Sequence, residues 1–174
     1  MKKISLLAMM ACGFLYAGSL SFESGSIKAH TEVFGDSSID PTAKKAVSRL
    51  SMEEAATTLR GAIEVSMADL ISDNKKRDTN MLETLESDTF PKAVFEIKEV
   101  SAKGANHLLK GTMSLHGVTK PMSFEGSITQ EGSKVRIKAS SMMKMSDFGI
   151  KPPKMVFLTV RDQVDLSVDV LLKR

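Results

Sequence analysis

The stretch LKGTMSLHGVTKPMSFEGSI, residues 109–128, decides the fold of this chain. Apolar and polar residues alternate along its first half, so that Leu109 and Met113 share one face. The alternation returns around Phe124 after a short break. Alternation with a period of two is typical of a half-buried β-strand, and two strands joined this closely pair in antiparallel fashion. The stretch therefore predicts an antiparallel hairpin whose turn lies within Gly117–Pro121.

The same alternation recurs through most of the chain. Further alternating runs cover residues 27–33, 59–67, 95–98, 134–139 and 164–170. Strands that follow each other closely in sequence usually pair with each other. Seven or eight strands of this kind in one domain indicate an all-β fold, either a barrel or a sandwich.

The beginning of the chain has the pattern of a secretory signal. Two lysines precede an apolar run that ends at Leu15, which is too short to span a membrane. We predict a signal peptide over residues 1–17 and one domain over residues 18–174, located in the periplasm or secreted. The only cysteine, Cys12, then leaves with the leader, and lipidation of Cys12 is the alternative.

Composition and charge argue against nucleic acid as a partner. The formal net charge of the whole chain is +3, and it falls to +1 once the two lysines of the leader are removed. There is no dense basic patch with aromatic residues between its charges, which is the usual signature of nucleic-acid binding. The chain has no Trp and 12 Met, and flexible Met side chains suit either a core or a deformable apolar cavity.

No combination of residues indicates a metal site or a catalytic group. His30 and His116 fall on the polar faces of their strands, and His107 falls in an expected turn. Their spacing does not match a zinc site, and no serine lies in a nucleophile elbow. Three thioethers within Met142–Met145 raise Cu(I) binding as an alternative to core packing. We predict neither metal nor catalytic residues.

A charged stretch, residues 72–97, interrupts the strands. Met81 has helical spacing with its apolar neighbours, and Asn80 followed three residues later by a glutamate fits a helix N-cap. Arg77 and Asp78 could form an acid–base pair. An aspartate beside cations at a helix start suits a structural clasp better than a general base. We therefore predict a short helix that covers one end of a barrel and is fastened by this pair.

Five motifs occur in order along the chain. They are SDNKKRDTNMLE from Ser72, FPKAVFEI from Phe90, GTMSLHGVTKPMSF from Gly111, MSDFGI from Met145 and VRDQVDLSVDVLL from Val160. Together with IKAHTEVF around His30, they resemble the YceI-like family, secreted bacterial proteins that bind lipids, over roughly residues 20–172.

The resemblance implies a lipocalin-like antiparallel barrel, which we predict to have eight strands and one or two short helices. Its apolar interior would hold an isoprenoid or fatty-acyl chain, with no cofactor other than the bound lipid. The structural motif residues that carry over are His30, Arg77, Asp78, His116 and Gly149. One departure is Asn80, where the family often has His, and this puts contacts with a ligand head group in doubt.

We predict non-enzymatic binding of a long-chain apolar lipid, such as a polyisoprenoid, an isoprenoid quinone or a fatty-acyl chain. The candidate ligand-binding residues are Ile63, Val65, Met81, Phe95, Ile97, Met113, Leu115, Phe124, Ile137 and Phe148. An enzyme or redox-associated protein acting on an isoprenoid quinone is one alternative, and a structural or Cu(I)-handling periplasmic protein is another. Transient contact with a membrane or membrane proteins stays open, as does a homodimer.

Overall fold

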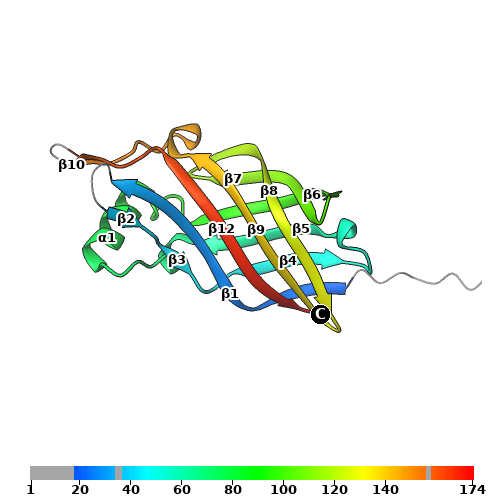
Figure 1. Ribbon diagram of the computed structural model, residues 1–174. Coiled ribbons are helices and arrows are strands. Elements are labelled where there is room, and N and C mark those ends of the chain that lie inside the picture. Colours follow the sequence, from blue (N-terminus) through cyan, green and yellow to red (C-terminus); the bar gives the residue numbers. More distant parts are fainter. Residues whose placement is uncertain (1–17, 34–36, 156–157) are drawn as a thin grey trace, which may run out of the picture.

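Eight long strands close into a barrel in the computed structural model, which describes residues 18–33, 37–155 and 158–174 (Figure 1). Each strand pairs antiparallel with the next, and the last pairs with the first. The strands are β1 (Gly18–Val33), β4 (Val47–Met52), β5 (Arg60–Ser66), β6 (Lys92–Lys103), β7 (Asn106–Leu115), β8 (Val118–Glu131), β9 (Lys134–Lys144) and β12 (Gln163–Lys173). The predicted all-β, eight-stranded antiparallel barrel is confirmed. The predicted signal peptide lies outside the described residues.

The smaller elements lie between the barrel strands. They are β2 (Ser37–Ile39), β3 (Thr42–Ala43), η1 (Ala56–Thr58), η2 (Met67–Asp69), α1 (Lys75–Thr84), η3 (Met145–Phe148), β10 (Lys154–Met155) and β11 (Leu158–Thr159). In Figure 1, α1 and β10 lie at one end of the barrel and the C-terminus lies at the other. No helix in the described part of the chain is long and apolar enough to cross a membrane.

The hairpin between β7 and β8 is tighter than predicted. Its turn consists of His116 and Gly117, with φ angles of 51° and 73°. Two successive positive φ angles are the mark of the two-residue turn that best matches the twist of paired strands. Pro121 consequently lies inside β8, where it pairs with Thr112, and not in the turn. A Cβ atom on Gly117 would also lie 2.8 Å from the ring of Phe90, so two constraints favour glycine there.

The sequence leaves residues 41–56 open between a helix, which their composition favours, and a strand that Val47, Arg49 and Leu50 could extend, and the structure forms strand β4 there. Only its alternate positions Leu50 and Met52 are buried, whereas Val47 on the opposite face is 52% exposed. Two buried apolar residues within six positions form too short a pattern to distinguish a strand from a helix. The strand is held by its neighbours, since β4 pairs with both β1 and β5.

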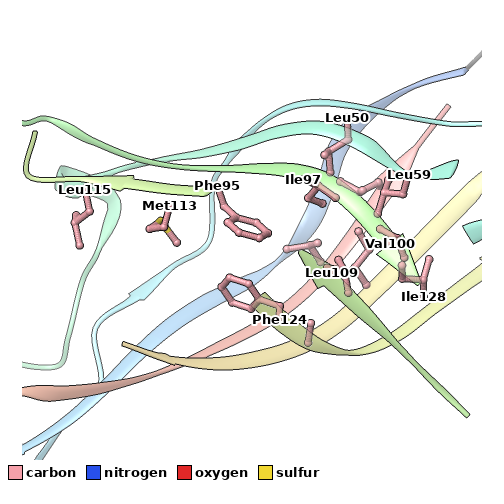
Figure 2. Close-up of a cluster of buried hydrophobic side chains, with 14 of the residues drawn as sticks. Leu50, Leu59, Phe95, Ile97, Val100, Leu109, Met113, Leu115, Phe124 and Ile128 are labelled. Carbon is pink, nitrogen blue, oxygen red and sulfur yellow. The ribbon is translucent and has the colours of Figure 1, made fainter. Parts of the chain in front are cut away.

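The barrel interior is solid at the end that carries Gly18 and the C-terminus. Leu59, Val135 and Leu172 have no exposed surface there. We call this end the filled half, and it consists of Leu20, Met52, Leu59, Val100, Ile128, Val135 and Leu172. In Figure 2, Leu59, Val100 and Ile128 crowd together, whereas Leu115 and Met113 stand apart toward the other end.

Candidate functional site: the interior cavity

The other end of the barrel encloses a cavity of about 450 Å³. Its lining is almost entirely apolar, and we call this part of the barrel the hollow half. All eight barrel strands contribute to its wall. Among its lining residues are Ile27 and Ala29 of β1, Leu50 of β4, Ala93 of β6, Ala139 and Met143 of β9, and Leu166, Val168 and Val170 of β12.

Nine of the ten candidate ligand-binding residues line this cavity. They are Ile63, Val65, Met81, Phe95, Ile97, Met113, Leu115, Phe124 and Ile137. The tenth, Phe148, is buried outside the lining, in the 3₁₀-helix η3 at the rim. Whether the nine residues contact a ligand stays a prediction. For the eight on strands, this position follows from alternation, because every second residue of a barrel strand points inward. Met81 lines the cavity from helix α1 instead.

A layer of stiff side chains closes the cavity toward the filled half. Leu50, Ile97, Leu109 and Phe124 form this layer, which we call the floor. Phe124 packs against Phe95, with ring centroids 4.8 Å apart and the rings tilted by 59°. Val100 of the filled half pairs with Leu109 of the floor across the β6–β7 ladder. The floor is therefore supported by packed side chains, not by solvent.

Helix α1 covers the open end of the cavity. Arg77, Asn80, Met81, Glu83 and Thr84 line the cavity from this helix, together with its C-cap, Leu85. Each of them lies three or four residues from another member, so they form one stripe on the helix surface. The stripe mixes polar and apolar side chains, unlike the strands below it. Together with Lys154 at the start of β10, it gives the cavity a polar mouth above an apolar interior.

The helix begins earlier than predicted, and its cap is a different residue. Asn74, not Asn80, is the N-cap, and its side-chain oxygen accepts a hydrogen bond from the Arg77 amide at 3.1 Å. Three consecutive polar residues before the helix obscured this start, because any of Ser72, Asp73 and Asn74 can act as a cap. Asn80 is instead part of the stripe that faces the cavity.

Arg77 and Asp78 anchor the helix separately, not as a pair. The Ser72 amide donates to Asp78 Oδ1 at 2.9 Å, and Arg77 donates to Asp73 Oδ1 at 3.2 Å. Both contacts tie the first helical turn to the segment just before it. The carboxylate of Asp78 therefore accepts a backbone hydrogen bond that holds the start of the helix, which is a structural role.

Three of the sequence motifs meet at the rim beside the helix. The His116 ring donates from Nδ1 to the Phe148 carbonyl oxygen at 3.2 Å and packs on Phe90, with ring centroids 4.5 Å apart. His116 Nε2 lies 3.5 Å from Glu86 Oε1, an ion-pair distance that is too long for a well-formed hydrogen bond. Gly149 ends η3 with a φ of 73°. These four residues, Phe90, His116, Phe148 and Gly149, therefore lock the rim and do not line the cavity, although other residues of the same motifs do.

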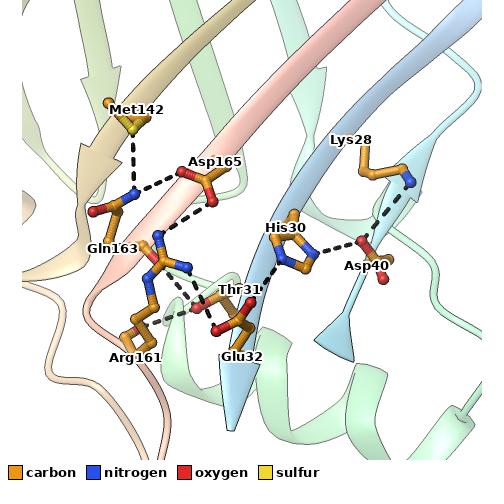
Figure 3. A network of polar contacts seen from close by, with 9 residues as sticks. All are labelled: Lys28, His30, Thr31, Glu32, Asp40, Met142, Arg161, Gln163 and Asp165. Atoms are coloured by element: carbon orange, nitrogen blue, oxygen red, sulfur yellow. Dashed lines mark hydrogen bonds and ion pairs between the residues drawn. The ribbon is translucent and has the colours of Figure 1, made fainter. Parts of the chain in front are cut away.

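A polar network lies on the outside of the hollow half (Figure 3). The His30 ring donates to Asp40 Oδ1 at 2.8 Å, and this bond raises the pKa of His30. Next to it, the hydroxyl of Thr31 points the other way and lies 2.9 Å from the Arg161 carbonyl oxygen. Thr31 is buried and lines the cavity, so its polar group is satisfied by backbone.

Several lining residues were not named as site residues from the sequence. The alternating runs of β1 and β12 contain Ile27, Leu166 and Val168, all of which line the cavity. Their alternation was visible, but it does not tell which inward residues surround a void and which are packed. The Met run is divided between the two faces of the sheet: Met142 is 67% exposed, whereas Met143 lines the cavity.

Within the described residues, no group of three or more His, Cys, Asp or Glu side chains is placed to hold a metal ion. The polar side chains of the lining lie mainly at the mouth. The arrangement can therefore enclose an apolar chain and leave a polar end group at α1.

Comparison with known proteins places the barrel in a family. The model of the YceI-like domain matches residues 18–172. A UPF0312 protein of Pseudomonas putida is 28% identical over 117 residues, which cover 62% of this chain and 60% of that protein. The match thus spans less than two thirds of the length of that relative.

Two solved structures share the fold at low sequence identity. Burkholderia cenocepacia BcnA has a TM-score of 0.75 at 14% identity, covering 84% of this chain and 95% of that one. A polyisoprenoid binding domain from Saccharophagus degradans, implicated in plant cell wall breakdown, has a TM-score of 0.69 at 11% identity, covering 89% and 97%. Since the domain model matches nearly all of a chain that folds as this barrel, the protein belongs to the YceI-like family.

Proposed function

We propose that this protein binds the apolar chain of a long-chain lipid in the hollow half, without catalysing a reaction on it. The observation that carries the proposal is the cavity of about 450 Å³ with an almost entirely apolar lining inside a closed barrel. Buried apolar space on this scale is the usual form of a small-molecule site. The polar mouth at α1 gives the other end of an amphiphile a place near solvent.

Burial alone supplies enough free energy for this binding. Each methylene group that leaves water contributes about 0.8 kcal/mol, so ten of them contribute roughly 8 kcal/mol before the costs of ordering the chain. The ligand consequently needs no charged partner in the interior. This agrees with a wall made from residues such as Ile63, Val65 and Val168.

The positions of the polar groups favour binding over catalysis. Asp78 accepts a hydrogen bond from the Ser72 amide, and His30 lies outside the barrel wall with Asp40. A general acid or base must reach the reacting atom of its substrate. Arg77 and Asn80 do line the mouth, where they can orient an end group. The bound lipid is therefore proposed as cargo or as a sensed ligand.

Family membership supports the proposal, because one structural neighbour is described as a polyisoprenoid binding domain. We further propose that the chain acts after export, in the periplasm or outside the cell, where free lipids need a carrier.

The direct test is native mass spectrometry of the protein purified from its own source, followed by extraction and identification of the lipid. Ala139→Phe fills the cavity from β9, and Ala105→Phe makes the same change in an exposed turn. We expect the parent and Ala105→Phe to carry a lipid and Ala139→Phe to lose it. A parent protein that carries no lipid and takes up none from solution would exclude this function.

A further inference from the structure

His116 lies at the rim with both of its ring nitrogens facing hydrogen-bond acceptors. Nδ1 lies 3.2 Å from the Phe148 carbonyl oxygen, and Nε2 lies 3.5 Å from Glu86 Oε1. Nε2 is buried, and it has no hydrogen-bond partner within the part of the chain that the structure describes. A neutral imidazole has one donor and one acceptor nitrogen, whereas an imidazolium donates from both. Only the protonated ring can therefore satisfy both contacts.

The backbone at the two ends of this contact is strained. Within residues 18–33, 37–155 and 158–174, only Glu86 and His116 combine a side chain with a positive φ angle, of 46° and 51°. A positive φ is uncommon for a residue with a side chain, and strain of this kind gathers at ligand clamps and switch regions. Because the two strained residues face each other, the strain points to a role for the contact between their side chains.

Glu86 occupies the position that ends helix α1. The Glu86 amide donates to the Glu83 carbonyl oxygen, and the Ser87 amide donates to that of Leu82, both at 3.0 Å. These two bonds make a Schellman motif, in which glycine usually takes the left-handed position. A glutamate at this position places a carboxylate at the rim. Since α1 covers the cavity, a bond made by that carboxylate holds the end of the cover.

The segment that follows the helix also rests on the His116 ring. Phe90 packs on the ring with centroids 4.5 Å apart, and the Phe90 amide donates to the Glu86 carbonyl oxygen at 2.8 Å. Leu85, directly before Glu86, lines the cavity. The ring thus connects η3, through the Phe148 carbonyl, with the C-terminal end of the cover.

The charges around the ring leave Glu86 as its partner. Among the described residues, Glu86 is the one acid within ion-pair distance of His116. The neighbouring elements bring two further charges, Asp147 of η3 and Lys120 of β8, which lie 3.9 Å apart and offset each other. The Glu86 side chain is 60% exposed, so water weakens the pair and the effect of a proton is modest.

We propose that His116 and Glu86 form a proton-binding site that fastens α1 over the cavity in acid and loosens it as the pH rises. The proton adds a donor at Nε2, which binds the Glu86 carboxylate, and its loss leaves two acceptors facing each other. Histidine is the side chain that ordinarily changes charge between about pH 5 and pH 8. This inference rests on the proposed function, because the cavity under α1 is the lipid site. Lipid release should therefore be slower in acid.

The experiment follows the release of N-phenyl-1-naphthylamine, an apolar probe that stays uncharged from pH 5.5 to pH 8.5. Loaded protein is mixed with phosphatidylcholine vesicles that carry a spin-labelled quencher, and the loss of fluorescence gives the release rate. We expect release to be about two- to fivefold faster at pH 8.5 than at pH 5.5, the size expected for a partly exposed ion pair. Nitrogen-15 NMR of the empty protein reports whether both ring nitrogens of His116 carry a proton.

Two variants remove the proton site, and two others serve as controls. Glu86→Gly removes the carboxylate and suits the left-handed backbone, so it should keep the melting temperature and lose the pH dependence of release. His116→Asn also tolerates that backbone and should lose the pH dependence. Asp88→Asn changes an exposed acid two residues from Glu86, and His30→Gln removes a histidine outside the barrel wall. Both controls should keep the pH dependence.

The outcomes separate the two proposals. If the parent protein takes up none of the probe at either pH, lipid binding fails, and the ring NMR alone then decides the proton site. If the probe binds but is released equally fast at both pH values, or if Glu86→Gly keeps the pH dependence, lipid binding stands and the proton site is wrong. A His116 ring with only one proton at pH 5.5 also excludes the site. A doubly protonated ring at pH 5.5, with a pH dependence that Glu86→Gly loses and Asp88→Asn keeps, supports it.

Discussion

The filled half and the hollow half of the barrel are built from the same alternating strands, but their interiors differ. The inward positions of the filled half carry Leu, Val, Ile and Met, and they close on one another. Several inward positions of the hollow half carry small side chains, among them Ala29, Ala93 and Ala139. The void therefore arises from side-chain size at a few inward positions, since the strands run continuously through both halves.

The two halves should consequently contribute differently to the stability of the protein. A filled core supplies stability through burial and close packing. Residues that line an unfilled cavity lack packing contacts on the side that faces the cavity. Covering the open end is left to α1, which is half-buried at most. We expect the filled half to hold the barrel closed and the hollow half to accept change at low cost.

Truncation should separate the halves most strongly. Leu59→Ala opens a new cavity in packed surroundings and should cost about 2–5 kcal/mol of unfolding free energy. Leu166→Ala only enlarges an existing cavity, so its cost should stay below about 2 kcal/mol. Denaturant unfolding followed by circular dichroism measures both. Equal losses at the two positions would mean that the hollow half is packed in solution.

Overpacking gives a second contrast, on two inward positions of β9 that lie four residues apart. Val135→Phe adds volume in the filled half and should destabilise the protein by about 1–3 kcal/mol, whereas Ala139→Phe has room and should cost the empty protein less. Thermal melting of the delipidated variants measures this difference. A melting temperature lowered as much by Ala139→Phe as by Val135→Phe would contradict an open interior.

The sequence predicts the barrel better than it predicts the boundary between these halves. Alternation reports which residues face inward, which is why Phe95 and Met113 were named correctly as inward-facing. It also names Val135 as inward, although Val135 lies in the filled half. Whether an inward residue borders a void depends on the side chains opposite, which come from distant strands.

Local rules also had limits near the rim. The two-residue turn at His116–Gly117 was placed too late, because Pro121 suggested a turn and a proline can also lie in a strand whose partner does not need its amide. Phe148 was expected in the ligand site, but its backbone carbonyl instead accepts a hydrogen bond from His116. A sequence motif groups these residues, but it does not show whether their side chains line the cavity or hold the rim together.

Loosening α1 should affect only the hollow half. Asp78→Ala removes the acceptor of the Ser72 amide and should cost about 0.5–2 kcal/mol, as for other helix-start residues. Asp78→Asn keeps an oxygen in place and should lose less. Hydrogen exchange should quicken in α1 and stay slow at Val135 and Leu172. Faster exchange in the filled half as well would show that the two halves unfold together.

Charge pairs on the outer surface extend the comparison. His30 pairs with Asp40 outside the hollow half, and Arg136 makes two hydrogen bonds of 2.8 Å to Asp169 outside the filled half. Hydrogen bonding to Asp40 raises the pKa of His30 above 6.5, and the same bond lowers the pKa of Asp40 below 3.8. The Arg136 hydrogen bonds likewise lower the pKa of Asp169 below 3.8.

The smallest expected effect is the pH dependence of these pairs. A raised pKa means that the contribution of His30 is fully present below pH 6.5 and is lost as the pH rises through its folded pKa. The lowered pKa of Asp40 means that its contribution is present above pH 3.8 and is lost at lower pH. His30→Gln should therefore cost more at pH 5.5 than at pH 8.5, by about 0.2–1 kcal/mol for a half-exposed pair.

Glu32 and Lys28 also face this pair, so Glu32→Gln serves as a check on their share. Arg136→Gln should show no such difference, because an arginine stays charged and Asp169 titrates only in acid. Denaturant unfolding at the two pH values decides it, and a cost of His30→Gln that does not change with pH would show that the ring is held by packing alone.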